Sequence, residues 1–159
     1  MSVAFTKEQD LEATAADLPD RPISQHPNLV TPEGLAAIDA ALAEARAAYA
    51  SAQVAGGVES DRTAMARATR DLRYWSSRRA SAELVERPAS LETVAFGARV
   101  TFEREDGRRQ SYRIVGEDEA DPTKGSISYV APLARALFGK GVGDVAQAPN
   151  GEVEILAVE

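Results

Sequence analysis

The spacing of hydrophobic positions follows a helical period over the first half of the chain. Between residues 35 and 52, and again between 65 and 82, one narrow set of positions recurs at alternating intervals of three and four. The first set is Leu35, Ile38, Leu42, Ala45, Tyr49 and Ala52, and the second is Met65, Ala68, Leu72, Trp75, Arg79 and Ala82. This spacing is typical of helices that pack along a single stripe. Two matched stripes are best buried against each other, which predicts an antiparallel helical hairpin of coiled-coil type.

The hairpin is predicted over residues 31–87, with its tip near 55–61. Thr31 is a good N-cap for the first helix, because its hydroxyl can accept from a free backbone N–H. The consecutive glycines Gly56 and Gly57 interrupt the helical pattern. Glycine readily adopts the left-handed conformation that ends a helix, so the chain is expected to reverse there.

Residues 93–159 change to the period of two that is typical of strands. "ARVTFERE" and "RQSYRIVG" flank Asp106-Gly107, and "GDVAQA" and "EVEILAV" flank Pro149-Asn150-Gly151. Both separators are strong hairpin turns. With "GSISYV" as a further strand and "APLARALFG" as one short helix, the pattern predicts a small antiparallel sheet domain. The fold class is therefore α+β, with the expected hinge between the hairpin and the sheet domain in "VERPASLET".

Residues 1–30 are expected to form a mobile, proline-rich arm. Pro19, Pro22 and Pro27 remove backbone donors and favour extended conformations in the residues before them. Thr6 and Gln9 could cap a short helix in "TKEQDLEATAADL", but its apolar positions are few, so we expect disorder or loose packing here.

Composition narrows the class of protein. The chain has 159 residues and a formal net charge of −7, which disfavours binding to bare duplex DNA, because such binding depends on neutralising phosphates. Cysteine is absent and His26 is the only histidine, so no zinc site of the usual kind is expected. Apolar runs are too short to cross a bilayer and no secretory start is present, from which we expect a cytoplasmic protein without a membrane partner.

A resemblance to a known family rests mainly on the C-terminal part. "YRIVGEDEAD", "PLARALFGK" and "GEVEI" are similar to the most specific pieces of the bacterial Gre transcript-cleavage factors, and "TPEGLAAIDAAL" resembles the opening of their hairpin. The resemblance covers residues 28–159.

The resemblance implies an FKBP-like sheet domain and a mechanism that works through RNA polymerase. In the family the sheet domain docks on the polymerase, which places Pro132 and Leu133 at the expected contact. The hairpin enters the secondary channel and presents acidic residues that help hold the polymerase's second Mg²⁺, so that backtracked RNA is hydrolysed. Glu59 and Asp61 would be those acids, with Asp61 as the Mg²⁺ ligand. No cofactor of its own is implied, and nascent RNA or DNA would be met only within the polymerase complex.

The sequence departs from the family at the tip. The family motif is Gly-Asp-x-x-Glu, and aligning Gly57 with its glycine places Val58 at the aspartate and Asp61 at the glutamate. The hairpin is also shorter by about one heptad per helix, roughly 10 Å of reach. From the residues alone, Glu59 and Asp61 are better explained as acids that favour a helix N-terminus. With the resemblance, capping and a delivered carboxylate explain Asp61 equally well, and delivery is less favoured for Glu59.

The second predicted helix is rich in arginine. Four of these residues, Arg62, Arg67, Arg70 and Arg73, could form a basic stripe that faces RNA or the channel. The alternative is a solvated face whose ion pairs contribute little to stability.

Several functions remain open at this stage. Cleavage stimulation competes with a non-cleaving regulator that occludes the channel. A prolyl isomerase is suggested by fold analogy alone, which is a weak basis for activity. A plain coiled-coil interaction module is the remaining alternative, although we expect a monomer.

Overall fold

The computed structural model describes residues 18–54 and 59–159. It divides into two compact units. Unit 1 holds residues 18–25 and Ile38–Ser81, and unit 2 holds His26–Ala37 and Ala82–Glu159. The boundary falls inside the first long helix.

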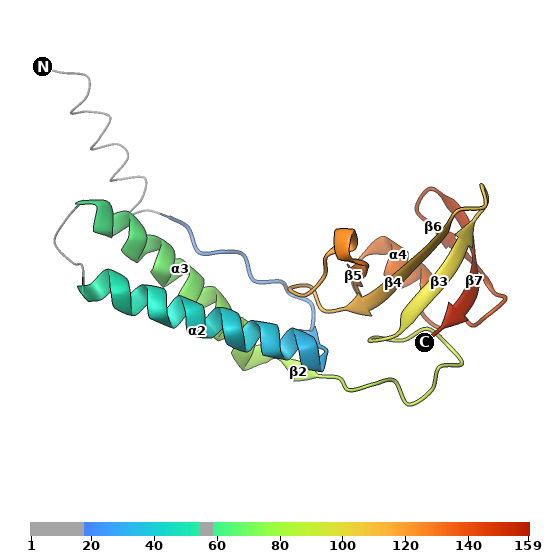
Figure 1. Ribbon diagram of the computed structural model, residues 1–159, viewed down its shortest axis with the longest axis horizontal. Helices are drawn as coiled ribbons and strands as arrows, with labels where there is room; N and C mark the ends of the chain where they lie inside the picture. The colour runs from blue at the N-terminus through green and yellow to red at the C-terminus, as the bar shows by residue number, and fades with distance from the viewer. Residues whose placement is uncertain (1–17, 55–58) are drawn as a thin grey trace, which may run out of the picture. The chain divides into compact units, whose positions relative to one another are not determined.

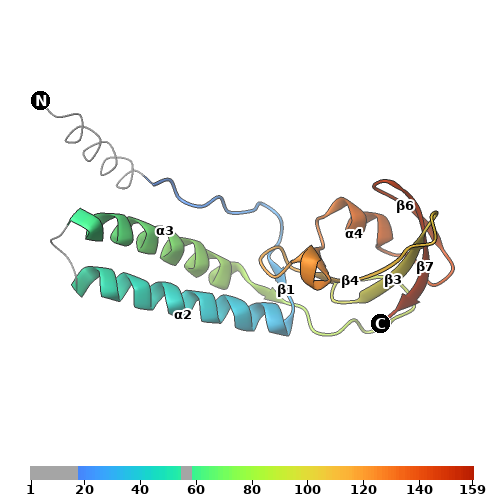
Figure 2. The same ribbon diagram turned by 45° about the horizontal axis from the view of Figure 1, so that its top comes forward.

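Two helices of equal length, 23 residues each, form the helical part: α2 (Pro32–Val54) and α3 (Glu59–Ser81). They lie side by side and run in opposite directions (Figures 1 and 2). The stripe predicted for α2 is confirmed, since Ile38, Leu42, Ala45 and Ala52 are buried, and the other two members are half-buried. Because these side chains recur every three or four residues, they all lie on one side of the helix.

The stripe on α3 differs from the prediction at its polar member. Arg79 is exposed and its Nε lies 2.6 Å from Asp39 Oδ1 on α2. Arg78 is the buried arginine, with 2% of its surface exposed. Trp75 and Leu72 are half-buried, and Ala68 is fully buried. The strict alternation of three and four therefore holds for α2 but not to the end of α3, where the buried face shifts by one residue.

Unit 2 contains a curled five-stranded sheet with the order β5-β4-β3-β7-β6 (Figure 1). Its strands are β3 (Arg99–Arg104), β4 (Arg109–Val115), β5 (Ser126–Ser128), β6 (Val145–Ala148) and β7 (Gly151–Val158). The predicted hairpins β3–β4 and β6–β7 are both present. The sheet is mixed rather than antiparallel, however, because β5 pairs with β4 in parallel. The chain between these two strands includes a 3₁₀ turn, η1 (Pro122–Lys124), which makes the crossover possible.

The core of unit 2 is built from alternating strand positions and one face of the short helix α4 (Pro132–Leu137). Its buried members are Val94, Val100, Phe102, Ile114, Ile127, Ala134, Leu137, Ala146, Val153 and Ile155. At the β6–β7 turn, Asn150 has a φ of 70°, which asparagine tolerates better than most residues. Pro149 before it suits the first central position of such a turn.

The end of the predicted arm belongs to unit 2. Leu29–Val30 form strand β1, which pairs in parallel with β2 (Glu83–Leu84). Val30 is buried, and the Val85 N–H donates to its carbonyl oxygen at 2.9 Å. The structure thus differs from the predicted boundaries at 30 and 87, because two-residue strands carry too little periodicity to be recognised. Residues 1–17 of the predicted arm lie outside the described residues.

Thr31 is the predicted N-cap of α2, and its hydroxyl also contacts Glu119 in the segment that follows β4. Thr31 Oγ1 accepts from the Gly34 N–H at 2.9 Å and donates to Glu119 Oε1 at 2.5 Å. Thr31 is only 1% exposed, so its contact with Gly34 is buried, while the contact with the half-buried Glu119 is partly shielded from water. The first turn of α2 is thereby fixed to the segment that follows β4.

None of the helices in residues 18–54 and 59–159 is long and apolar enough to cross a membrane.

Candidate functional site

The acidic residues proposed for the hairpin tip lie at the edge of the described chain. Gly56, Gly57 and Val58 lie outside the described residues. Glu59 and Asp61 are in the first turn of α3, which begins at Glu59. That both residues present carboxylates to the polymerase stays a prediction. That Asp61 is a Mg²⁺ ligand also stays a prediction.

The two residues proposed for docking lie at the start of α4. Pro132 is exposed and occupies the first helical turn, where its missing N–H leaves no bond unmade. Leu133 is half-buried and packs against the hydrophobic core of unit 2. A charged substitution at Leu133 would therefore disturb the fold as well as any surface contact, whereas Pro132 can be changed at the surface.

The structure divides the predicted basic stripe into two halves. Arg62 and Arg67 are exposed, and no ion pair is recorded for them among the described residues. Arg73 Nη1 lies 3.3 Å from Asp20 Oδ1, and Arg70 Nε lies 3.7 Å from Asp71 Oδ1. The half nearer the start of α3 is thus open to solvent, while the other half is partly neutralised within unit 1.

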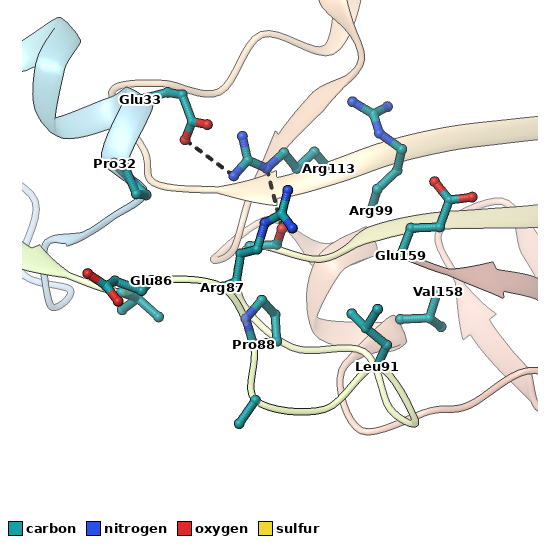
Figure 3. Close-up of a pocket in the computed structure, with 13 residues that line it drawn as sticks. Pro32, Glu33, Glu86, Arg87, Pro88, Leu91, Arg99, Arg113, Val158 and Glu159 are labelled. Carbon is teal, nitrogen blue, oxygen red and sulfur yellow. Dashed lines mark hydrogen bonds and ion pairs between the residues drawn. The ribbon is translucent and has the colours of Figure 1, made fainter.

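Unit 2 also has an open pocket of about 910 Å³ that the sequence pattern did not indicate (Figure 3). It is lined by the start of α2, by residues 85–91, and by the adjoining ends of β3, β4 and β7. Three of its lining residues are basic, Arg87, Arg99 and Arg113. Three are acidic, Glu33, Glu86 and Glu159.

Arg113 is the most constrained charge in this pocket. Its Nη2 lies 3.4 Å from Glu33 Oε2, and its Nε donates to the Gly97 carbonyl oxygen at 3.3 Å (Figure 3). Arg99 is its direct partner across the β3–β4 ladder. Like charges directly opposite each other are unfavourable in a sheet, so Glu33 offsets a repulsion that the register creates.

The pKa of the Glu33 carboxyl is set mainly by its own backbone N–H and by Arg113. A hydrogen bond from its own backbone N–H and then the positive charge of Arg113 lower the pKa of the Glu33 carboxyl. Its position in the first turn of α2 also favours the charged form. The carboxylate is therefore the stable state of Glu33 at neutral pH.

The pocket offers both signs of charge on a partly apolar floor that includes Leu91 and Val158. Sequence reasoning missed it because its members are far apart in the chain. The one available signal was the turn at Asp106-Gly107, whose register places Arg99 near Arg113.

Replacing Glu33 with Gln is expected to lower the free energy of unfolding by about 0.5 kcal/mol at pH 7, after allowance for solvent screening. Since the folded-state pKa of Glu33 is lowered, its contribution is present above the unfolded-state value and is lost as pH falls through the folded-state value. Urea denaturation at pH 7 and at pH 3 should show a smaller loss at pH 3. Glu44→Gln, an exposed position farther along α2, should change neither value; an equal loss at both pH values for Glu33→Gln would contradict this account.

Among the side chains that the structure describes, no group of three or more His, Asp or Glu residues could hold a metal ion.

Comparisons with known proteins agree on one family. Residues 88–159 match the family model described as "Transcription elongation factor, GreA/GreB, C-term". This range contains the whole five-stranded sheet and α4.

Individual relatives extend the match toward the helices. The transcription elongation factor GreA of Desulfovibrio desulfuricans is 38% identical over 108 residues, which cover 64% of this chain and 67% of that protein. GreB of Neisseria meningitidis is 42% identical over 96 residues, covering 57% and 59%. With others, such as GreA of Bacillus licheniformis, at 46% identity over 74 residues, the chain spans about half the relative's length, 47%.

Among solved structures, the GreA factor homolog Gfh1 of Thermus thermophilus is 23% identical, with a TM-score of 0.39, over 84% of this chain and 99% of that one. The assignment rests on the extent and identity of the match to the GreA sequence, together with the match of the sheet domain to the family model. The chain belongs to the GreA/GreB family of transcription elongation factors.

Proposed function

We propose that this protein binds RNA polymerase and modulates transcript elongation by inserting the α2–α3 hairpin into the secondary channel. Family membership supports the class of partner. The single observation that carries the proposal is the pair of 23-residue helices that lie side by side, with acidic residues at the start of the second. At 1.5 Å per residue, each helix is about 35 Å long.

In this proposal Asp61 supplies one carboxylate to the polymerase's Mg²⁺ site. Mg²⁺ prefers hard oxygen ligands, and paired metal ions stabilise the attacking and leaving oxygens of a phosphoryl transfer. Val58 offers no oxygen at the other position of the motif. We therefore expect cleavage stimulation to be weak and to depend on Asp61.

A channel-occluding regulator without cleavage activity is the second candidate. The observation in its favour is Val58, because a tip that lacks one of the two acids of the family motif can still fill the channel. A prolyl isomerase is disfavoured, since the residues that line the described pocket of unit 2 include no aromatic ring. Trp75 lies on α3, in unit 1.

Polymerase docking is tested by Pro132→Glu. Glutamate is favourable in a first helical turn, so α4 should persist while a charge enters the proposed apolar contact. Affinity for the core polymerase should fall at least about fivefold, the loss expected from a residue at the centre of an interface. Surface binding measurements at fixed salt give this value directly.

The matched control is Pro122→Glu, because Pro122 is also exposed and begins a short helical segment, η1. That variant should bind as the natural protein does. If both variants bind normally, the contact lies elsewhere on the protein. If neither the natural protein nor the control binds polymerase, the proposed function itself fails.

A further inference from the structure

The described N-terminal residues 18–25 contact one face of α3 within unit 1, and both views show this segment running beside the helix (Figures 1 and 2). Asp20 Oδ1 lies 3.3 Å from Arg73 Nη1. In the opposite sense, Arg21 Nη1 lies 3.7 Å from Asp71 Oδ1. The segment therefore forms two ion pairs with α3. In one it supplies the acidic residue, and in the other it supplies the arginine. Two reciprocal pairs at neighbouring positions set the register of the segment along the helix.

An aromatic contact reinforces the two ion pairs. The Arg21 guanidinium carbon lies 3.8 Å from the ring centre of Tyr74 and 5.4 Å from that of Trp75. The two rings pack edge to face, with centroids 4.9 Å apart. Both distances from Arg21 are within the range of cation–π attraction. Arg21 thus lies over an aromatic pair whose two members are half-buried in the structure.

We propose that residues 18–25 form an intramolecular clasp that covers Tyr74 and Trp75 and competes with external anions for Arg73. The Asp20 carboxylate occupies the place beside Arg73 that a phosphate or carboxylate from another molecule would take. Arg70 differs from Arg73, because its ion-pair partner Asp71 lies on α3 itself and not on the clasp. Opening of the clasp therefore releases Arg73 from its ion pair and uncovers the aromatic pair, on the helix that also carries the exposed Arg62 and Arg67.

The clasp is weak enough to open reversibly. Asp20 and Arg73 are largely exposed, with 62% and 67% of their side-chain surfaces accessible. Ion pairs of this kind are individually weak and are screened by salt. A clasp of this strength lowers the apparent affinity of an external anion by a modest factor and does not block binding outright.

Trp75 is the only tryptophan of the chain and reports directly on the covered face. Quenching of its fluorescence by acrylamide, a neutral probe, should increase in Arg21→Gln and should equal the natural protein in Arg46→Gln, an exposed arginine of α2. Circular dichroism of both variants shows whether α2 and α3 are intact. Equal quenching of the two variants, with both helices intact, would overturn the proposal that Arg21 covers Trp75.

Competition for Arg73 is measured with tripolyphosphate, whose binding is followed by Trp75 fluorescence at low salt. Asp20→Asn should bind it about two- to fivefold more tightly than the natural protein, the change expected from one exposed ion pair. Glu44→Gln removes an exposed acid of the same charge from α2 and should leave the affinity unchanged. In an Arg73→Gln background, Asp20→Asn should have no further effect, since the two residues act as one pair. An equal gain with and without Arg73 would overturn the proposal. Neither measurement requires polymerase, so their outcome is independent of the proposed function.

Discussion

Asp61→Asn is expected to reduce transcript cleavage on a backtracked polymerase complex at least about tenfold, while polymerase affinity stays unchanged. A metal ligand stabilises charge that develops in the transition state, and the loss of about 1.4 kcal/mol of that stabilisation already corresponds to a tenfold lower rate. Asparagine keeps the shape of the side chain but removes its negative charge. The measurement is the rate of RNA shortening in a stalled complex at saturating protein.

Two neighbouring variants sharpen this test. Glu59→Gln removes a charge two residues earlier in α3 and should have the smaller effect, because Glu59 does not match either acidic position of the family motif. Val58→Asp restores the missing acid and should raise cleavage above that of the natural protein. Rapid cleavage that survives Asp61→Asn would refute the proposed role of Asp61. No cleavage with either the natural protein or Val58→Asp would favour the channel-occluding regulator.

Gly116→Ala is expected to lower the free energy of unfolding by about 1–3 kcal/mol, the usual cost of forcing extra volume into a packed interior. Gly116 is buried, and a β-carbon there would lie far inside the contact distance of the Leu29 carbonyl oxygen. That oxygen is part of the backbone of β1 and cannot rotate away. The strand must move, which weakens its pairing with β2.

Urea denaturation measures the loss of stability, and amide hydrogen exchange locates it. The N–H groups of Glu83 and Val85 donate to Asn28 and Val30, so their protection should fall in Gly116→Ala. Gly34→Ala is the comparison, because its β-carbon would meet a side-chain oxygen of Glu119, which can move at the cost of its hydrogen bond from Thr31, and because alanine favours a helix. Its loss should be smaller. Equal losses, or unchanged exchange at Glu83 and Val85, would show that β1 tolerates the methyl group.

Local patterns predicted the elements whose signals are contained in a short stretch of chain. The stripe of α2 follows from the spacing of Ile38, Leu42 and Ala45, and the Thr31 cap from its own side-chain chemistry. The β3–β4 and β6–β7 hairpins follow from turn residues between two alternating segments. In each case the residues that decide the structure are neighbours in sequence.

Features that depend on distant residues were not predictable in this way. The parallel pairing of β5 with β4 depends on a crossover through η1, and no local pattern distinguishes it from a further hairpin. The pocket around Arg113 needs the sheet register together with the first turn of α2. At the proposed tip, the role of Asp61 rests on the sequence and on the family motif.

The parallel pair β1–β2 has a consequence for how this protein could vary in evolution. Leu29–Val30 and Glu83–Leu84 bring the entry and exit of the helical segment together in adjacent strands. The helices can therefore behave as an exchangeable cassette, since removing one heptad from each would leave both strand registers intact. The entropy of closing the shortened loop would change by only about 0.3 kcal/mol. The length of the α2–α3 hairpin can thus be altered by selection, or by a designer, without redesigning the β1–β2 pair that holds its ends.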